Sequence, residues 1–173
     1  KRRALPPEYS RNQDTWRRLN PGLEGDFYDD QDIEKFVQEH YPQYLRLYRE
    51  RARPVERADL LRYMAVHRYG GFYADMDTSC LKSVEPLRHH PCVVGVEFID
   101  DQGQTQYLQW FFGAAPGHPL MLEVLDEVQR RHDSHQWDNE HPDTQTLEVT
   151  GPRAFTAAVH RVLERDPESV AVH

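Results

Sequence analysis

Residues 57–77 read RADLLRYMAVHRYGGFYADMD, and this stretch decides the fold class. Apolar residues surround most of its first part, which predicts a buried helix over about Val55–Tyr69. Gly70-Gly71 ends that helix in the usual C-terminal way, and Phe72–Ala74 then reads as a short strand. A buried helix that leads through two glycines into a strand indicates an α/β layered fold.

Helices and short strands alternate along the rest of the chain. The predicted helices are Glu8–Leu19, Asp32–His40, Tyr41–Arg51, Pro119–Arg131 and a last helix opened by Thr150-Gly151-Pro152. The further predicted strands are Gly25–Tyr28, Val93–Phe98 and Tyr107–Phe112. We expect one catalytic domain over residues 1–173, truncated at one or both ends.

The composition is that of a folded, acidic domain. Hydrophobic residues make up 38% and charged residues 29%, which excludes a disordered chain. The net charge of -8 argues against nucleic acid or an anionic membrane surface as the main partner. Cys80 and Cys92 are too few for a disulfide scaffold, and they could pair or remain free thiols. An acidic protein that binds a diphosphate needs a cation or local basic residues.

Asp75 and Asp77 stand two residues apart where the predicted strand ends. In an extended chain, residues i and i+2 point the same way, so we expect both carboxylates in one small volume. Two such groups repel unless a cation lies between them or one is protonated. Mn²⁺ or Mg²⁺ would resolve this repulsion, and phosphate oxygens could complete the coordination. Alone, a D-x-D pair is more often a solvated turn than a metal site.

The preceding helix carries a second pair of charges. Asp59 and Arg62 are three residues apart and share one face of an apolar helix. A buried charge must be paired or must meet a ligand, so the two could also be a purely structural ion pair. Arg57 is close by, and the planar guanidinium group suits phosphate. Gly71 permits a tight turn and close backbone approach. These groups converge where a strand ends, the usual ligand site of open α/β sheets.

Several blocks resemble one family. Arg57–Tyr63, Tyr69–Thr78 and Cys80–Leu87 are similar to the D-x-D sugar transferases related to fungal Golgi mannosyltransferases, that is, to glycosyltransferase family 32. Gln109-Trp110, Ala115–Pro119 and Thr150–Pro152 most resemble the initiation-specific alpha-1,6-mannosyltransferase branch. In that branch a small polar residue is expected where this chain has Phe111.

The resemblance implies a single Rossmann-like nucleotide-sugar-binding domain of the GT-A type. We expect it to lack the family's first strand, which precedes the segment matching Leu5-Pro6-Pro7. The resemblance also implies Mn²⁺ between the D-x-D pair and the donor diphosphate. Asp77 would be the direct ligand, and Asp75 would contact the ribose and the metal shell.

The same resemblance assigns the donor site and the reaction. Asp59 and Arg62 would hold the donor sugar and phosphate, Tyr73 would border the nucleotide, and Arg57 and Gly71 complete the expected donor site. Asp75, Asp77 and Arg62 are the expected catalytic residues.

The expected reaction is the retaining transfer of a hexose onto a glycan or glycolipid, with GDP-mannose favoured over a UDP-sugar as donor. The expected location is the Golgi lumen, as part of a type II membrane protein anchored through a segment absent from this chain. For a bacterial or viral relative it would be the cytoplasm.

Two other functions fit part of the pattern. Asp75-Met76-Asp77-Thr78 also resembles the aspartyl motif of haloacid dehalogenase-type phosphatases, which expect a distal lysine, whereas no lysine follows Lys82. A non-catalytic nucleotide-sugar-binding domain is favoured by the missing first strand.

Among residues outside these motifs, Trp110 is expected to pack in the core rather than to stack on sugar. Glu97, Asp100 and Asp101 are expected to form a solvated loop rather than to touch the acceptor.

Overall fold

The structure is a computed structural model that describes residues 6–25 and 28–173. Its helices are α1 (Pro7–Leu19), α2 (Asp30–His40), α3 (Leu45–Glu50), α4 (Pro54–Tyr69), α5 (Pro119–Ser134), α6 (Pro142–Val149) and α7 (Pro152–Arg165). Its strands are β1 (Gly71–Ala74), β2 (Cys92–Ile99), β3 (Thr105–Ala114) and β4 (Ala171–Val172). The expected α/β class is confirmed, while β4 and α6 were not predicted. The strand predicted over residues 25–28 includes residues 26 and 27, which lie outside the described residues.

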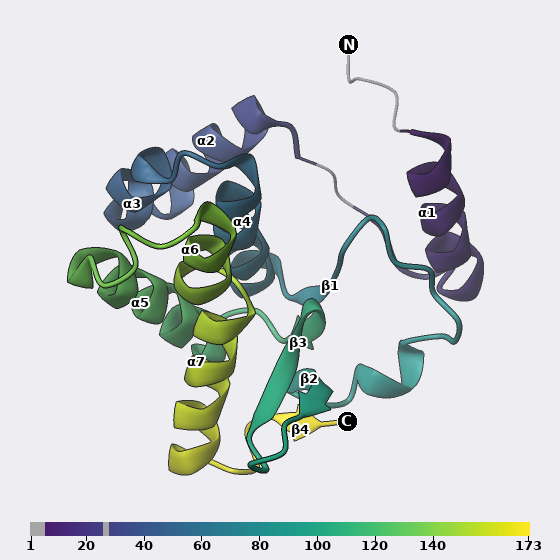
Figure 1. Ribbon diagram of the computed structural model, residues 1–173. Helices are drawn as coiled ribbons and strands as arrows, with labels where there is room; N and C mark the ends of the chain where they lie inside the picture. Colours follow the sequence, from purple (N-terminus) through teal and green to yellow (C-terminus); the bar gives the residue numbers. More distant parts are fainter. Residues whose placement is uncertain (1–5, 26–27) are drawn as a thin grey trace.

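The four strands form one mixed sheet in the order β1-β3-β2-β4. β3 runs antiparallel to both β1 and β2, and β4 pairs with β2 in parallel. Figure 1 shows the helices α2 to α7 gathered on one side of the sheet and α1 by itself on the other side. The sheet therefore separates a large helical layer from a single N-terminal helix.

The core lies between the sheet and the large helical layer. Tyr63 of α4, Phe112 of β3 and Phe155 of α7 are fully buried. Their ring centroids lie 6.0 Å apart for Tyr63 and Phe112, 5.9 Å for Tyr63 and Phe155, and 5.1 Å for Phe112 and Phe155. Truncation of such a ring to alanine costs about 3–5 kcal/mol, so these three residues fix α4 and α7 against β3.

The pairing of β3 with β2 is irregular in the middle of β3. Val94 pairs with Phe112 and Val96 pairs with Tyr107, so the single residue 95 of β2 faces residues 108–111 of β3. Residue 95 is a glycine, and a side chain there would collide with Leu108. β3 therefore bulges over residues 108–111.

Cys80 and Cys92 are both buried free thiols, so they do not pair. Burial raises the pKa of the Cys92 thiol to about 12. Within residues 6–25 and 28–173, no helix has the length and apolar character that crossing a bilayer requires.

Candidate active site

Asp59 and Arg62 form a buried ion pair on the inner face of α4. Arg62 Nη2 lies 2.9 Å from Asp59 Oδ1, and both side chains are almost fully buried. The i, i+3 spacing predicted from the sequence is therefore realised as a direct contact. Because a charged pair in an apolar interior is costly, its retention needs a reason beyond stability.

Asp59 has two further donors. Thr150 Oγ1 donates to Asp59 Oδ2 at 2.6 Å, and Gln109 Nε2 donates to Oδ1 at 3.2 Å. Burial nevertheless raises the pKa of Asp59 to about 6, although Arg62 and these hydrogen bonds act in the opposite direction. The ionised carboxylate is thus held in place at a cost in solvation free energy.

Arg62 connects this buried carboxylate to the end of β1. Its Nη1 lies 3.4 Å from Asp75 Oδ1 and donates to the backbone carbonyl of Gln109 at 3.2 Å. The guanidinium group stacks over the Tyr73 ring, 4.5 Å from the ring centroid. Arg62 Nε is buried and has no hydrogen-bond partner among the described residues. The side chain is therefore fixed in position while one donor remains unused.

Asp75 lies immediately after β1 and is about one-third exposed. Its backbone N–H donates to the Trp110 carbonyl at 2.9 Å, which anchors it to the bulge of β3. Its Oδ1 accepts a hydrogen bond from the Tyr73 hydroxyl at 2.5 Å. Burial raises the pKa of Tyr73, so this hydroxyl stays protonated as a donor. Asp75 is thus the point where the buried network reaches the surface.

The backbone around the D-x-D motif differs from the expectation. The strand ends at Ala74, and Asp75 to Thr78 form a turn closed by the Thr78 N–H donating to Asp75 O at 3.0 Å. The expected alternation of an extended strand was wrong for Asp77, because Met76 and Asp77 are the central residues of this turn. Asp77 is exposed, and its carboxylate has no hydrogen bond or ion pair with any described residue. It is free to bind a ligand.

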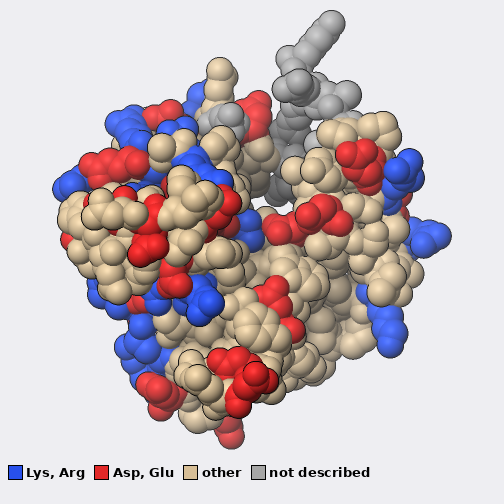
Figure 2. All heavy atoms as spheres, viewed as in Figure 1, with Lys and Arg blue, Asp and Glu red and all other residues tan. Residues whose placement is uncertain are grey.

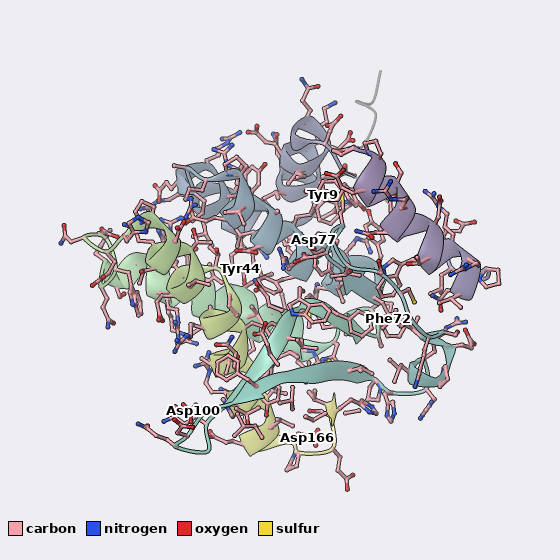
Figure 3. The ribbon with its side chains drawn as sticks, turned by 45° about the vertical axis from the view of Figure 1, so that its right-hand side comes forward. Tyr9, Tyr44, Phe72, Asp77, Asp100 and Asp166 are labelled. Atoms are coloured by element: carbon pink, nitrogen blue, oxygen red, sulfur yellow. The ribbon has the colours of Figure 1, made fainter. Side chains whose placement is uncertain are left out.

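Helix α1 holds the turn from the far side of the sheet. Asn12 Nδ2 donates to the Met76 carbonyl at 3.1 Å, and Trp16 Nε1 donates to the Thr78 carbonyl at 3.1 Å. Figure 3 shows Asp77 between α4 and α1, on the side where α1 carries Tyr9.

The same helix face continues along the loop that follows the turn. Thr15 Oγ1 accepts from the Cys80 N–H at 2.7 Å, and Asn20 Oδ1 accepts from the Val84 N–H at 2.8 Å. This role of α1 was not predicted from the sequence, although residues 12, 15, 16 and 20 follow helical spacing.

Phe111 belongs to the same contact. Its ring lies 5.7 Å from the Trp16 ring and 6.0 Å from the Phe72 ring. A large aromatic residue at this position therefore packs α1 against β1 and β3, which a small polar residue could not do.

Gln109 and Thr150 are site residues that the sequence analysis did not assign. Gln109 Nε2 contacts Asp59 Oδ1, the Tyr63 hydroxyl at 2.6 Å and the Thr150 carbonyl at 3.1 Å. Both residues lie in blocks that carry the family resemblance, which was the available signal.

Arg57 and Gly71 lie apart from this network. Arg57 Nε donates to the Arg51 carbonyl at 2.8 Å, and its guanidinium group lies over the Tyr48 ring. Gly71 begins β1, at the opposite end from Asp75, with a φ of 93° that favours glycine. The donor-binding roles expected for both residues remain predictions.

The site opens onto a hollow in the surface. Figure 2 shows acidic side chains bordering the hollow between α1 and the helical layer, near the end of β1. Among the described residues, no group of three or more His, Cys, Asp or Glu side chains is placed to hold a metal ion. A metal at the D-x-D turn would therefore need most of its ligands from a bound molecule.

Comparison with known proteins identifies this arrangement. The solved structure of the PaToxG glycosyltransferase matches with a TM-score of 0.67 over 96% of this chain and 68% of that chain, at 15% sequence identity. This likeness confirms the expected glycosyltransferase type of α/β fold. Residues 6–94 match the family model described as the glycosyltransferase sugar-binding region containing the DXD motif. The chain belongs to this family.

Curated relatives are also similar. Inositol phosphoceramide mannosyltransferase 3 of Schizosaccharomyces pombe is 27% identical over all of this chain and 46% of its own length. The initiation-specific alpha-1,6-mannosyltransferase of the same yeast is 32% identical over 61% of this chain and 31% of its own length. The expected family resemblance is thus confirmed, and the chain spans less than half the length of these two relatives.

Proposed function

We propose that this protein is a metal-dependent retaining glycosyltransferase that moves mannose from GDP-mannose onto a glycan or glycolipid. The observation that carries the proposal is the position of Arg62, held between buried Asp59 and surface Asp75 at 2.9 and 3.4 Å. A fixed cation beside a D-x-D turn is what a nucleotide diphosphate requires in an acidic protein. The names of the curated mannosyltransferases support mannose as the sugar.

The D-x-D residues fit a divalent cation. Asp77 has an exposed carboxylate without a protein partner, and Asp75 uses only Oδ1 in its contacts with the described residues. Hard cations such as Mn²⁺ or Mg²⁺ prefer such oxygen ligands, and diphosphate oxygens and water can complete the shell. When bound, the cation would supply Lewis-acid polarisation of the leaving diphosphate. Asp77 would be its direct ligand, with Asp75 supporting it.

Arg62 supplies electrostatic stabilisation as negative charge develops on the leaving group. Asp59 orients Arg62, since both of its carboxylate oxygens already have protein partners. The Tyr73 ring stacks against the guanidinium group of Arg62, and its hydroxyl donates a hydrogen bond that positions Asp75. In same-face transfer the departing phosphate can accept the acceptor proton, so no protein base is assigned.

The relatives also suggest where the chain works. We place it in the Golgi lumen, as part of a longer protein anchored outside residues 1–173, and do not assign it a nucleic-acid partner. Localisation of the tagged full-length protein tests this placement, and a cytoplasmic signal contradicts it.

The decisive experiment is calorimetry with GDP-mannose and UDP-glucose, with and without Mn²⁺, followed by a transfer assay on α-mannosides. We expect Mn²⁺-dependent binding of GDP-mannose and its slow hydrolysis when acceptor is absent. Phosphate release from a simple ester would instead support the phosphatase. Binding without hydrolysis or transfer would support a non-catalytic domain, and either result would overturn the proposal.

A further inference from the structure

Trp110 is exposed on the sheet, next to the candidate active site. The structure leaves 40% of this residue accessible, so the expectation that it packs in the core was wrong. Its indole Nε1 donates to Glu97 Oε1 at 3.3 Å, and Glu97 Oε2 accepts from Gln106 Nε2 at 2.6 Å. A large aromatic surface is thus held in a fixed orientation by a polar pair while it remains open to solvent.

The position of Trp110 relates it directly to the D-x-D motif. Its carbonyl accepts the Asp75 N–H at 2.9 Å, so the two residues lie directly beyond the last pair of the β1–β3 ladder, Ala74 and Phe111. Trp110 lies in the bulge of β3. Gln109, the residue before Trp110, contacts the Asp59–Arg62 pair. The ring therefore lies at the same end of the sheet as the groups assigned to the donor.

The polar group at the ring is acidic. Glu97, which accepts from the Trp110 indole, is exposed, and no Lys or Arg among the described residues forms an ion pair with it. Asp100 and Asp101 are also exposed, in the turn that joins β2 to β3 at the tip of the hairpin (Figure 3), and they are not in contact with the ring. Like charges at this site would repel a phosphate-bearing ligand.

We propose that Trp110 and Glu97 form the acceptor subsite, which binds a neutral pyranose. The assignment of this subsite to the acceptor rests on the proposed function, whereas the binding of a pyranose does not. The apolar C–H face of the sugar packs on the indole ring, which buries aromatic surface. Glu97 and Gln106 accept and donate hydrogen bonds at the ring hydroxyls, which fixes the orientation of the sugar. The Glu97 carboxylate favours a neutral glycan over an inositol phosphate headgroup.

Binding can be measured without turnover. The ¹⁵N-labelled chain is titrated with α-1,6-mannobiose and, separately, with inositol 1-phosphate, both with GDP and Mn²⁺ present. We expect the Trp110 indole N–H signal, assigned from Trp110→Phe, to shift with mannobiose and not with inositol phosphate. Trp110→Ala should weaken mannobiose binding at least tenfold, and Trp110→Phe should retain part of it.

Two further variants separate a subsite from a general loss of structure. Tyr69→Ala removes an aromatic residue that is 53% exposed at the other end of β1, and it should bind mannobiose like the unmodified chain. Glu97→Gln removes one charge and should allow weak binding of inositol phosphate. GDP-mannose affinity, measured in parallel, should be the same in Trp110→Ala as in the unmodified chain.

Absence of mannobiose binding, or equal affinity in Trp110→Ala, would overturn the subsite. Preference for inositol phosphate would overturn the assigned charge selectivity. Mannobiose binding that depends on Trp110, in a chain that transfers no sugar, would support the subsite while the proposed function fails.

Discussion

Replacement of Asp59 by asparagine should separate stability from activity. The pKa of Asp59 is about 6 in the folded protein, against an ordinary value of 3.8. A carboxyl group with a raised folded pKa contributes stability below its unfolded pKa, and that contribution is lost as the pH rises through the folded pKa. Between about pH 4 and pH 6 the unmodified chain should therefore lose stability relative to Asp59→Asn, by at most about 3 kcal/mol.

The contacts of Asp59 explain why the amide is tolerated. Its oxygen can face Arg62 and Gln109, and its NH₂ group can donate to Thr150 Oγ1. Removal of one partner of a buried ion pair ordinarily costs about 3–5 kcal/mol because the other charge is left alone. Here Arg62 keeps Asp75 and the Gln109 carbonyl, so we expect no such loss at pH 7.

Activity should fall in Asp59→Asn, although stability at pH 7 is retained. Without the buried negative charge, Arg62 loses the ion pair that orients it, a charged contact worth about 1.5–3 kcal/mol, and the donor reaction should slow by about 10- to 150-fold. Urea unfolding between pH 4 and pH 7.5 gives the stability difference between the two proteins, in which other titrating groups cancel. A difference independent of pH, or one that grows in favour of the unmodified chain as the pH rises, would refute this reasoning.

Three other substitutions test the site and its support. Asp77→Ala should abolish Mn²⁺-dependent donor hydrolysis without lowering the melting temperature, because the exposed side chain contacts no described residue. Asp166→Ala, far from Asp77 in Figure 3, is the matched control, and full hydrolysis in Asp77→Ala would contradict the assignment. Trp16→Ala removes the hydrogen bond to Thr78 and the packing on Phe111. It should lower the unfolding free energy by about 2–4 kcal/mol in urea unfolding and weaken Mn²⁺ binding in calorimetry. Unchanged Mn²⁺ affinity would show that α1 does not position the turn. Gly71→Ala should lower the unfolding free energy by about 1–2 kcal/mol because of its φ of 93°, although a Cβ there meets no atom within 4 Å. A stability equal to that of the unmodified chain would contradict this backbone conformation.

The local parts of the site were predictable from the sequence. Helical spacing places Asp59 and Arg62 on one face of α4, and Gly70-Gly71 marks the change to β1. The turn at Asp77 was not predictable in the same way, because strand alternation applies only while the chain stays extended. A strand as short as Gly71–Ala74 gives no local signal that it ends one residue before the first aspartate.

The remaining parts depend on distant contacts. Gln109 and Thr150 reach Asp59 from 50 and 91 residues away, and the bulge that turns Trp110 outward depends on pairing with β2. Composition and periodicity describe a segment by itself and carry no such register information. The family resemblance marked these blocks without indicating what they touch.

Helix α1 has no buried residue and is attached to the loop after the D-x-D turn mainly through polar contacts. Such a helix can detach in a local opening while the core between the sheet and α4 stays folded. Any molecule that binds the ordered turn must then also slow amide exchange throughout residues 7–19, although it touches none of them. In this protein, the N-terminal helix would report on occupancy of the site through its exchange protection alone.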